Sequence, residues 1–164
     1  MKNIDYDWTK VEKGIQHIAM QMYESGWRPD YIVGITRGGL VPAVMLSHMT
    51  NIPMHTLSIQ LGAEGLEENT ESNCWMAEDA FGYKEQKNIL VIDDINRGGD
   101  ALAWLMNDWK AGCLPNDERW GQVWHNNVKF ASILSDPNSI VDTDYFYQEI
   151  YSEDENWVTF PWET

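Results

Sequence analysis

The chain has 164 residues, with 11 basic and 26 acidic side chains and a formal net charge of −15 at pH 7. This length suits one domain with a sizeable core, and so acidic a chain would repel a phosphate backbone, which excludes polymeric nucleic acid as a partner. The sequence contains no apolar run of about 18 residues, as a membrane span needs, and no apolar leader. With two cysteines outside any ligand spacing, it predicts a cytoplasmic protein with free thiols and no membrane partner.

The first third of the chain predicts helices alternating with strands. Asp7 can cap a helix from Trp8 to about Ser25, in which apolar residues recur at helical spacing. The run from Tyr31 to Ile35 is short, β-branched and continuously apolar, which is typical of a strand buried on both faces. The next predicted elements are a helix from Leu40 to about Met49 and a strand from Met54 to Gln60.

The rest of the chain continues this alternation after a long interruption. Leu61 to Gln86 is acidic and weakly periodic, so it predicts a mobile loop that acts as a lid. Strands that alternate with helices predict a parallel sheet covered on both faces, with ligands bound beyond the carboxyl ends of the strands. The remaining expected elements are strands over Ile89–Ile92, Val128–Leu134 and Tyr145–Tyr151, a helix over Ala101–Ala111, and a polar connection over Cys113–Asn127.

Two glycine pairs follow predicted strands, one in "TRGG" (Thr36 to Gly39) and one in "DDINRGGD" (Asp93 to Asp100). Glycine lets a backbone approach a ligand, and the N–H groups of a following helix attract an anion. Either pair alone is equally well a tight turn, whereas two at neighbouring strand ends favour a phosphate site. The sequence contains neither G-x-G-x-x-G nor a Walker A lysine, so a dinucleotide or P-loop site is not indicated.

Asp93 and Asp94 stand at the end of an apolar strand. Carboxylates beside a buried strand are costly unless they meet hydroxyl groups, a cation or a metal ion. Successive strand residues point in different directions, so this pair can bind a diol or hold Mg²⁺ through water, although one of the two can simply cap the turn.

Three segments, in this order along the chain, resemble parts of one known family. "YIVGITRGGLVPAVML" resembles the pyrophosphate loop, "NILVIDDINRGGDAL" the phosphoribosyl-pyrophosphate motif and "WVTFPW" the base-stacking tail of type I phosphoribosyltransferases, closest to the xanthine/guanine and hypoxanthine members. The resemblance implies an α/β fold: a single domain over residues 1–164, with a central, mostly parallel sheet flanked by helices, a flexible loop and a small C-terminal hood.

The activity that the resemblance implies is purine salvage. A Mg²⁺-dependent glycosyltransferase would move ribose 5-phosphate from phosphoribosyl pyrophosphate to a purine-like base and release pyrophosphate. These two substrates are the implied partners, and a homo-oligomer of the chain is compatible with them.

The same resemblance implies the site residues. Asp93 and Asp94 fall on the acids that hold the ribose hydroxyls and the metal shell, and Arg97 falls on the third catalytic position. Trp157 falls on the ring that stacks on the base, although it could instead be a C-terminal packing anchor. The implied substrate-binding set is Thr36, Arg37, Gly38, Gly39, Asn96, Gly98, Gly99, Asp100, Ala101, Asp136, Trp157 and, through its carbonyl, Val158.

The chain departs from the family pattern at several of these positions. Arg97 stands where the family usually has the aspartate thought to take the proton of the base, and Asp136 stands where purine members often carry a lysine. Gly98, Asp100 and Ala101 replace a threonine, a glycine and a hydroxyl residue. We expect Asp100 to cap its own helix and to compete with a phosphate, and Arg97 to offset that charge by binding the phosphate.

Three functions stay open from the sequence. The first is a working transferase with unusual base recognition. The second is a catalytically impaired protein of the same fold that binds a nucleotide or diphosphate as a regulator, which the charges of Arg97 and Asp100 favour. A hydrolase with Asp93 as the nucleophile is weaker, because the sequence "DDIN" supplies no D-x-D pair.

Overall fold

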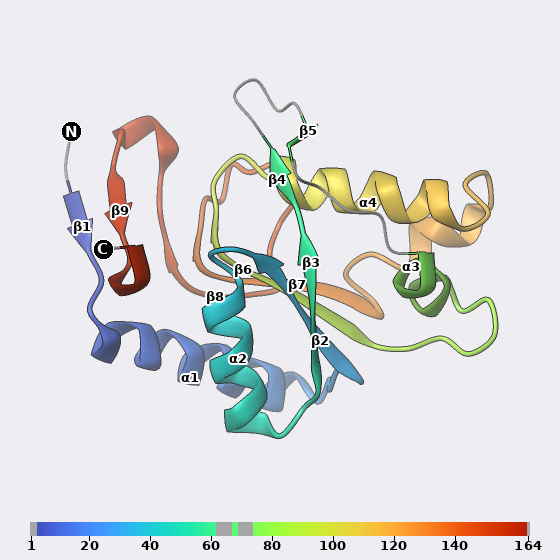
Figure 1. Cartoon of the computed structure of the whole chain (residues 1–164), viewed down its shortest axis with the longest axis horizontal. Coiled ribbons are helices and arrows are strands. Elements are labelled where there is room, and N and C mark those ends of the chain that lie inside the picture. The colour runs from blue at the N-terminus through green and yellow to red at the C-terminus, as the bar shows by residue number, and fades with distance from the viewer. Residues whose placement is uncertain (1–2, 62–66, 69–73, 164) are drawn as a thin grey trace.

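The computed structural model describes residues 3–61, 67–68 and 74–163, which are arranged as a sheet between two layers of helix (Figure 1). The central sheet has five strands in the order β3-β2-β6-β7-β8, and each neighbouring pair is parallel. The prediction of an α/β fold with a central, mostly parallel sheet is therefore confirmed. The strands are β2 (Tyr31–Thr36), β3 (Met54–Ser58), β6 (Ile89–Asn96), β7 (Val128–Ser135) and β8 (Tyr145–Glu149).

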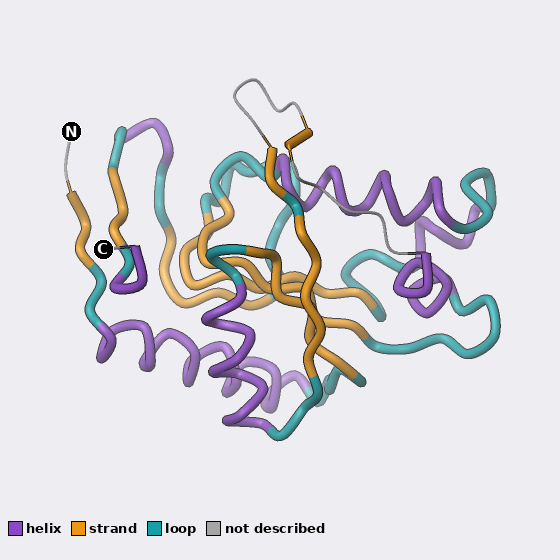
Figure 2. The backbone as a smooth tube through the Cα atoms, viewed as in Figure 1, coloured by secondary structure: helices purple, strands orange, loops and turns teal. Residues whose placement is uncertain are grey.

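Helices α1 (Trp8–Ser25) and α2 (Leu40–Thr50) cover one face of the sheet, and α3 (Cys74–Phe81) and α4 (Asp100–Gly112) cover the other (Figures 1 and 2). Alternate residues of β2 enter opposite cores: Ile32 packs on the α1 side, whereas Val33 packs on the α4 side. Because both faces are buried, the strand is continuously apolar, as its sequence predicts. In the part of the chain that the structure describes, no helix is long and apolar enough to cross a membrane.

The ends of α1 follow directly from local chemistry. The Asp7 side chain accepts a hydrogen bond from the Lys10 backbone N–H at 2.8 Å, which satisfies one of the free amides of the first turn. At the other end Gly26 has a φ of 72°, and its N–H donates to the Tyr23 carbonyl at 3.1 Å. This left-handed conformation favours glycine, so both predicted bounds of the helix are confirmed.

The expectation of a loop throughout Leu61 to Gln86 is wrong for its second half. Cys74–Phe81 forms α3, and Met76, Ala77, Ala80 and Phe81 are buried in the core that includes α4. These four residues form one narrow apolar face on a very short helix. Because the surrounding sequence is acidic, the helical spacing of the apolar residues is not apparent from the sequence. Strands β4 (Gln60–Leu61) and β5 (Glu67–Glu68) form a small antiparallel pair, and the rest of the expected lid, 62–66 and 69–73, lies outside the described residues.

Two other segments contain more structure than their sequences predict. The connection from Cys113 to Asn127 includes a 3₁₀ helix, η2 (Glu118–Gln122), with Trp120 buried and its indole N–H donating to the Cys113 carbonyl at 2.8 Å. At the opposite end of the molecule, β1 (Asn3–Asp5) pairs in parallel with β9 (Trp157–Thr159) (Figure 1). We call β1, β9, η3 (Ser152–Asp154) and η4 (Pro161–Glu163) the hood.

Candidate active site

The two glycine-containing turns converge because β2 and β6 are adjacent and parallel, with Gly34 opposite Ile92. A Cβ atom added to Gly39 would lie 2.5 Å from the Ile92 carbonyl oxygen and 2.6 Å from that of Ile35, so a larger residue does not fit between the strand ends. The approach is closer still at Gly38, where an added Cβ atom would lie 2.1 Å from Oδ2 of Asp94. The "TRGG" turn and the two acids therefore form one site.

Asp93 and Asp94 lie within β6, which runs four residues beyond its predicted end to Asn96. Oδ1 of Asp93 accepts the Asp94 backbone N–H, and Oδ1 of Asp94 accepts that of Ile95, each at 2.8 Å. Burial and the neighbouring charge of Asp94 raise the pKa of Asp93 well above its ordinary value. Burial also raises the pKa of Asp94, against hydrogen bonds that lower it. The negative charges of the two carboxylates are costly in this buried setting, and a bound cation would offset that cost.

The pair fits Mg²⁺ only as a site shared with a ligand. Among the residues that the structure describes, no group of three or more His, Cys, Asp or Glu side chains could hold a metal ion. Enzymes commonly bind Mg²⁺ through one or two carboxylates together with substrate phosphates and water. The donor set here therefore suits Mg²⁺ brought to the site with a phosphorylated substrate.

The turn between β6 and α4 encloses a cavity of about 170 Å³. It opens at the N-terminus of α4, whose free backbone N–H groups favour an anion. Gly99 occupies the cap position with a φ of 89°, and no side chain caps the helix, so the expectation that Asp100 caps it is wrong. Asp100 is instead the first helical residue, because the cap position falls on the left-handed Gly99 and the helix begins one residue earlier than predicted. The lining residues are Asp93, Ile95, Asn96, Arg97, Gly98, Gly99, Asp100, Ala101, Leu102 and Ala131.

Asn96 supports the wall of this cavity. Its side chain is buried and donates from Nδ2 to the Val141 carbonyl at 2.8 Å, while Oδ1 accepts from the Ser139 hydroxyl at 3.2 Å. These bonds fasten the end of β6 to the loop that follows β7. The side chain of Asn96 therefore has a structural role, and its predicted contact with a substrate stays a prediction.

Arg97 and Asp136 both contact the segment that leads into β9. Arg97 Nη2 donates to the Asn156 carbonyl at 2.7 Å. Asp136 is only 5% exposed, with Oδ1 accepting the Asn138 N–H at 2.8 Å and Oδ2 that of Ser152 at 2.9 Å. A direct contact of Arg97 with a 5′-phosphate, or of Asp136 with a base, stays a prediction.

Trp157 and Val158 begin β9 and differ in exposure. The Trp157 side chain is 59% exposed, whereas Val158 is buried in the core shared with α1. Trp157 is therefore not a packing anchor, and its indole face is available to a planar ligand. Val158 anchors the strand through its side chain.

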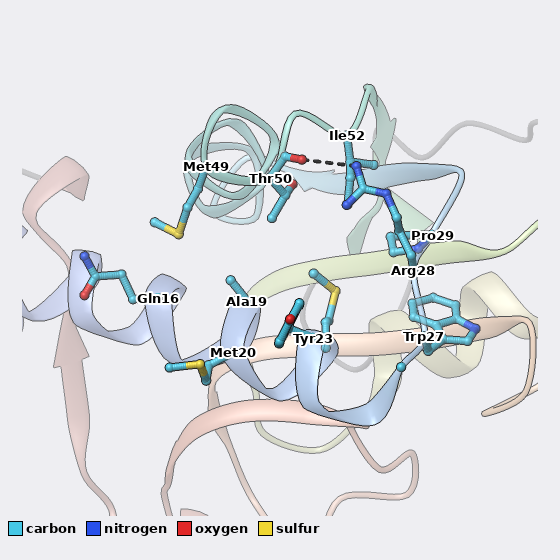
Figure 3. Close-up of a pocket in the computed structure, with 12 residues that line it drawn as sticks. Gln16, Ala19, Met20, Tyr23, Trp27, Arg28, Pro29, Met49, Thr50 and Ile52 are labelled. Carbon is cyan, nitrogen blue, oxygen red and sulfur yellow. Dashed lines mark hydrogen bonds between the residues drawn. The ribbon is translucent and has the colours of Figure 1, made fainter.

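A larger cavity, of about 660 Å³, lies between the C-terminal halves of α1 and α2 (Figure 3). Its walls are mostly apolar. Among the described residues that line it, Arg28 is the only charged one, and it donates from Nη2 to the Thr50 carbonyl at 3.2 Å. The acids and glycine turns do not line it. This cavity has no set of groups for catalysis, so the strand-end site is the candidate active site.

Carboxylates, glycine turns and a helix N-terminus thus lie together at one edge of the sheet. The family model of the phosphoribosyl transferase domain matches residues 5–164, and the chain belongs to this family. It is 24% identical to the xanthine-guanine phosphoribosyltransferase of Cereibacter sphaeroides over 99% of this chain and 87% of the relative.

Solved structures agree with this assignment at the level of the fold. The purine phosphoribosyltransferase of Pyrococcus horikoshii superposes with a TM-score of 0.67 at 24% identity, covering 100% of this chain and 95% of the other. The xanthine-guanine-hypoxanthine phosphoribosyltransferase of Helicobacter pylori gives 0.69 at 18% identity, covering 99% and 94%. The type I phosphoribosyltransferase fold, closest to the purine members, is thus confirmed.

Proposed function

We propose that the chain transfers ribose 5-phosphate from phosphoribosyl pyrophosphate to a purine-like base, releasing pyrophosphate with the help of Mg²⁺. The convergence of the "TRGG" turn with Asp93 and Asp94 at one sheet edge is the observation that carries this proposal. The names of the relatives, which are xanthine-guanine and hypoxanthine-guanine enzymes, support the purine class.

Each part of the site has a role in this reaction. The Thr36–Gly39 turn, with exposed Arg37, receives the diphosphate, and the turn from Gly98 to Ala101 receives the 5′-phosphate at the start of α4. Asp93 and Asp94 hold the ribose hydroxyls and the metal shell, and their negative charge favours the cationic sugar of the transition state. Mg²⁺, when bound, offsets charge on the departing diphosphate. The exposed Trp157 stacks on the base.

Neither of the two charged residues at the family's base-contacting positions suits the role of accepting the proton of the incoming base. The guanidinium group of Arg97 has no lone pair with which to accept it. Burial acts to raise the pKa of Asp136, but hydrogen bonds from Ser152 and Asn138 and the charge of Arg97 lower it overall, which makes this carboxylate a weak base. We therefore expect slow turnover with bases that must lose a proton to the enzyme.

The test is pyrophosphate release with Mg²⁺ and phosphoribosyl pyrophosphate across guanine, xanthine, hypoxanthine and adenine. Release with one of these bases supports the transferase. Tight binding of phosphoribosyl pyrophosphate without release with any base supports the regulatory alternative. The absence of both binding and release would overturn the proposed function.

We also propose that the chain self-associates through the apolar cavity between α1 and α2, as a homo-oligomer. The chain contains 26 acidic residues in 164, yet the described residues that line this cavity include no acidic one and three methionines. Tyr23, which is 85% exposed, is one of the residues that line it (Figure 3). Depletion of charge with Met, Tyr and Trp is typical of the core of an interface. A second copy that docks here meets no carboxylate among the described residues of this cavity.

The free thiols of Cys74 and Cys113 suit a reducing compartment. We therefore propose that the protein is cytoplasmic.

A further inference from the structure

Two residues from different parts of the site hold the same hood segment. Arg97, in the turn between β6 and α4, donates to the Asn156 carbonyl at 2.7 Å. Asp136, directly after β7, accepts the Ser152 N–H at 2.9 Å. These bonds fix the two ends of the segment 152–156, and Trp157 follows at once.

The segment 152–156 has little else to hold it. Its residues are exposed or half-exposed. The Asp154 N–H donates to the Tyr151 carbonyl and the Glu155 N–H to that of Ser152, at 3.0 and 3.1 Å, so these bonds lie within the segment or beside it. A segment with few buried contacts opens easily, and its order then depends on the bonds at its ends.

Both holding groups are charged and well suited to a fixed geometry. The backbone N–H groups of Ser152 and Asn138, together with the charge of Arg97, keep the pKa of Asp136 low despite its burial, so the carboxylate is ionised. The guanidinium group of an arginine such as Arg97 carries a positive charge. Hydrogen bonds to charged groups are stronger than those between neutral groups. Removing one partner leaves the other without its hydrogen bond, which costs free energy.

We propose that Arg97 and Asp136 are positioning residues that clamp the segment 152–156 and thereby orient Trp157 over the base. The orienting role rests on the proposed function, whereas the clamp itself does not. The side chain of Asp136 acts through Ser152 and that of Arg97 through Asn156, so neither needs to touch the base.

A clamping role and a phosphate-binding role of Arg97 predict different kinetics. Loosening Trp157 weakens the base subsite, so the KM for the base rises while the KM for phosphoribosyl pyrophosphate stays the same. If Arg97 bound the 5′-phosphate, its loss would raise the KM for phosphoribosyl pyrophosphate instead.

The test uses the full chain with Arg97→Met, which removes the charge at similar length, and Asp136→Asn, which keeps one oxygen acceptor. Arg119→Met is the matched control, because Arg119 forms an exposed ion pair with Asp117 at 3.1 Å and lies over Phe81 of α3, remote from the hood. Hydrogen exchange is followed without ligand in peptides covering 151–157, and KM is measured for both substrates.

We expect exchange in 151–157 to accelerate by about tenfold in each clamp variant and not in the control, and the KM for the base to rise by about tenfold. Unchanged exchange in both clamp variants overturns the clamp. Faster exchange with an unchanged KM for the base, or a raised KM for phosphoribosyl pyrophosphate alone, overturns the orienting role. If the wild type transfers no ribose phosphate, the exchange experiment still decides the clamp, so the two proposals fail separately.

Discussion

Gly34 of β2 lies opposite Ile92 of β6, and this register decides which residues meet at the active site. Two residues past Gly34 the "TRGG" turn begins, and directly past Ile92 stands the pair of acids. Parallel neighbouring strands deliver both to the same edge of the sheet. The site therefore depends on backbone packing at Gly39 as much as on the charges of Asp93 and Asp94.

The first prediction tests the acids as ligand groups. Asp93→Asn combined with Asp94→Asn should abolish Mg²⁺-dependent binding of phosphoribosyl pyrophosphate, because the amide side chains carry no charge for the cation. Isothermal titration calorimetry measures the binding, and circular dichroism checks that the fold is kept. Unchanged affinity in the double variant would make the acids a structural cap.

The second prediction concerns pH. Burial and Asp94 raise the pKa of Asp93 in the folded state, so the folded protein holds the Asp93 proton more tightly than the unfolded chain does. As pH rises from the unfolded value of about 4 through the raised one, ionisation lowers the stability of the wild type. Without Mg²⁺, Asp93→Asn should melt about 2–4 °C higher at pH 7 and nearly equal to the wild type at pH 3. A lower melting temperature for Asp93→Asn at pH 7 would contradict this.

The third prediction tests the backbone contact at Gly39. Gly39→Ala places a methyl group against the Ile92 and Ile35 carbonyl oxygens, so we expect a loss of about 2 kcal/mol in the free energy of unfolding. Gly121→Ala is the control, since a Cβ there meets nothing within 4 Å, and its effect should stay within about 0.5 kcal/mol. Urea unfolding measures both. Equal effects in the two variants would show that the strand ends separate easily.

Local patterns in the sequence predict the parts of this fold that local chemistry determines. The cap at Asp7 and the apolar run of β2 are such cases, and both are confirmed. The glycine turns and the acids are also brought together as their order along parallel strands predicts.

The parts that the sequence did not predict depend on contacts between distant segments. Strand β1 has only three residues and exists because β9, at the other end of the chain, pairs with it. The buried hydrogen bonds of Asn96 join it to Ser139 and Val141, more than 40 residues away, and no local pattern indicates them. Likewise, in the sequence Arg97 and Asp136 are separate departures from the family pattern, whereas in the structure both hold the segment 152–156 that leads into β9.

The fourth prediction tests self-association. Tyr23→Glu adds an acid to the apolar face between α1 and α2, so it should convert the oligomer to a monomer in light scattering after size exclusion. Tyr83→Glu is the matched control, because Tyr83 is also exposed, at 59%, but follows α3 on the other face of the sheet. A monomeric wild type, or dissociation by both variants, would defeat this interface.

The last prediction asks whether the site lacks a proton acceptor. Arg97→Asp supplies a carboxylate in the turn between β6 and α4, and general base catalysis is commonly worth a hundredfold or more in rate, so we expect kcat to rise by roughly tenfold or more. Arg97→Ala should give no such gain, because it removes the charge without adding a base. Steady-state kinetics with guanine, xanthine and hypoxanthine measures both variants.

In the single Arg97→Asp variant the new carboxylate faces the ionised Asp136, and the hydrogen bond to the Asn156 carbonyl is lost. Adding Asp136→Lys restores opposite charges at the two positions, so the double variant should exceed the single one in kcat. The KM for the base should stay raised in both, since neither replaces the bond to Asn156. If no variant exceeds the wild type in kcat, the proton leaves by another route and Arg97 is not the cause of slow turnover. A raised KM for phosphoribosyl pyrophosphate in both Arg97→Asp and Arg97→Ala would instead place the guanidinium on the 5′-phosphate.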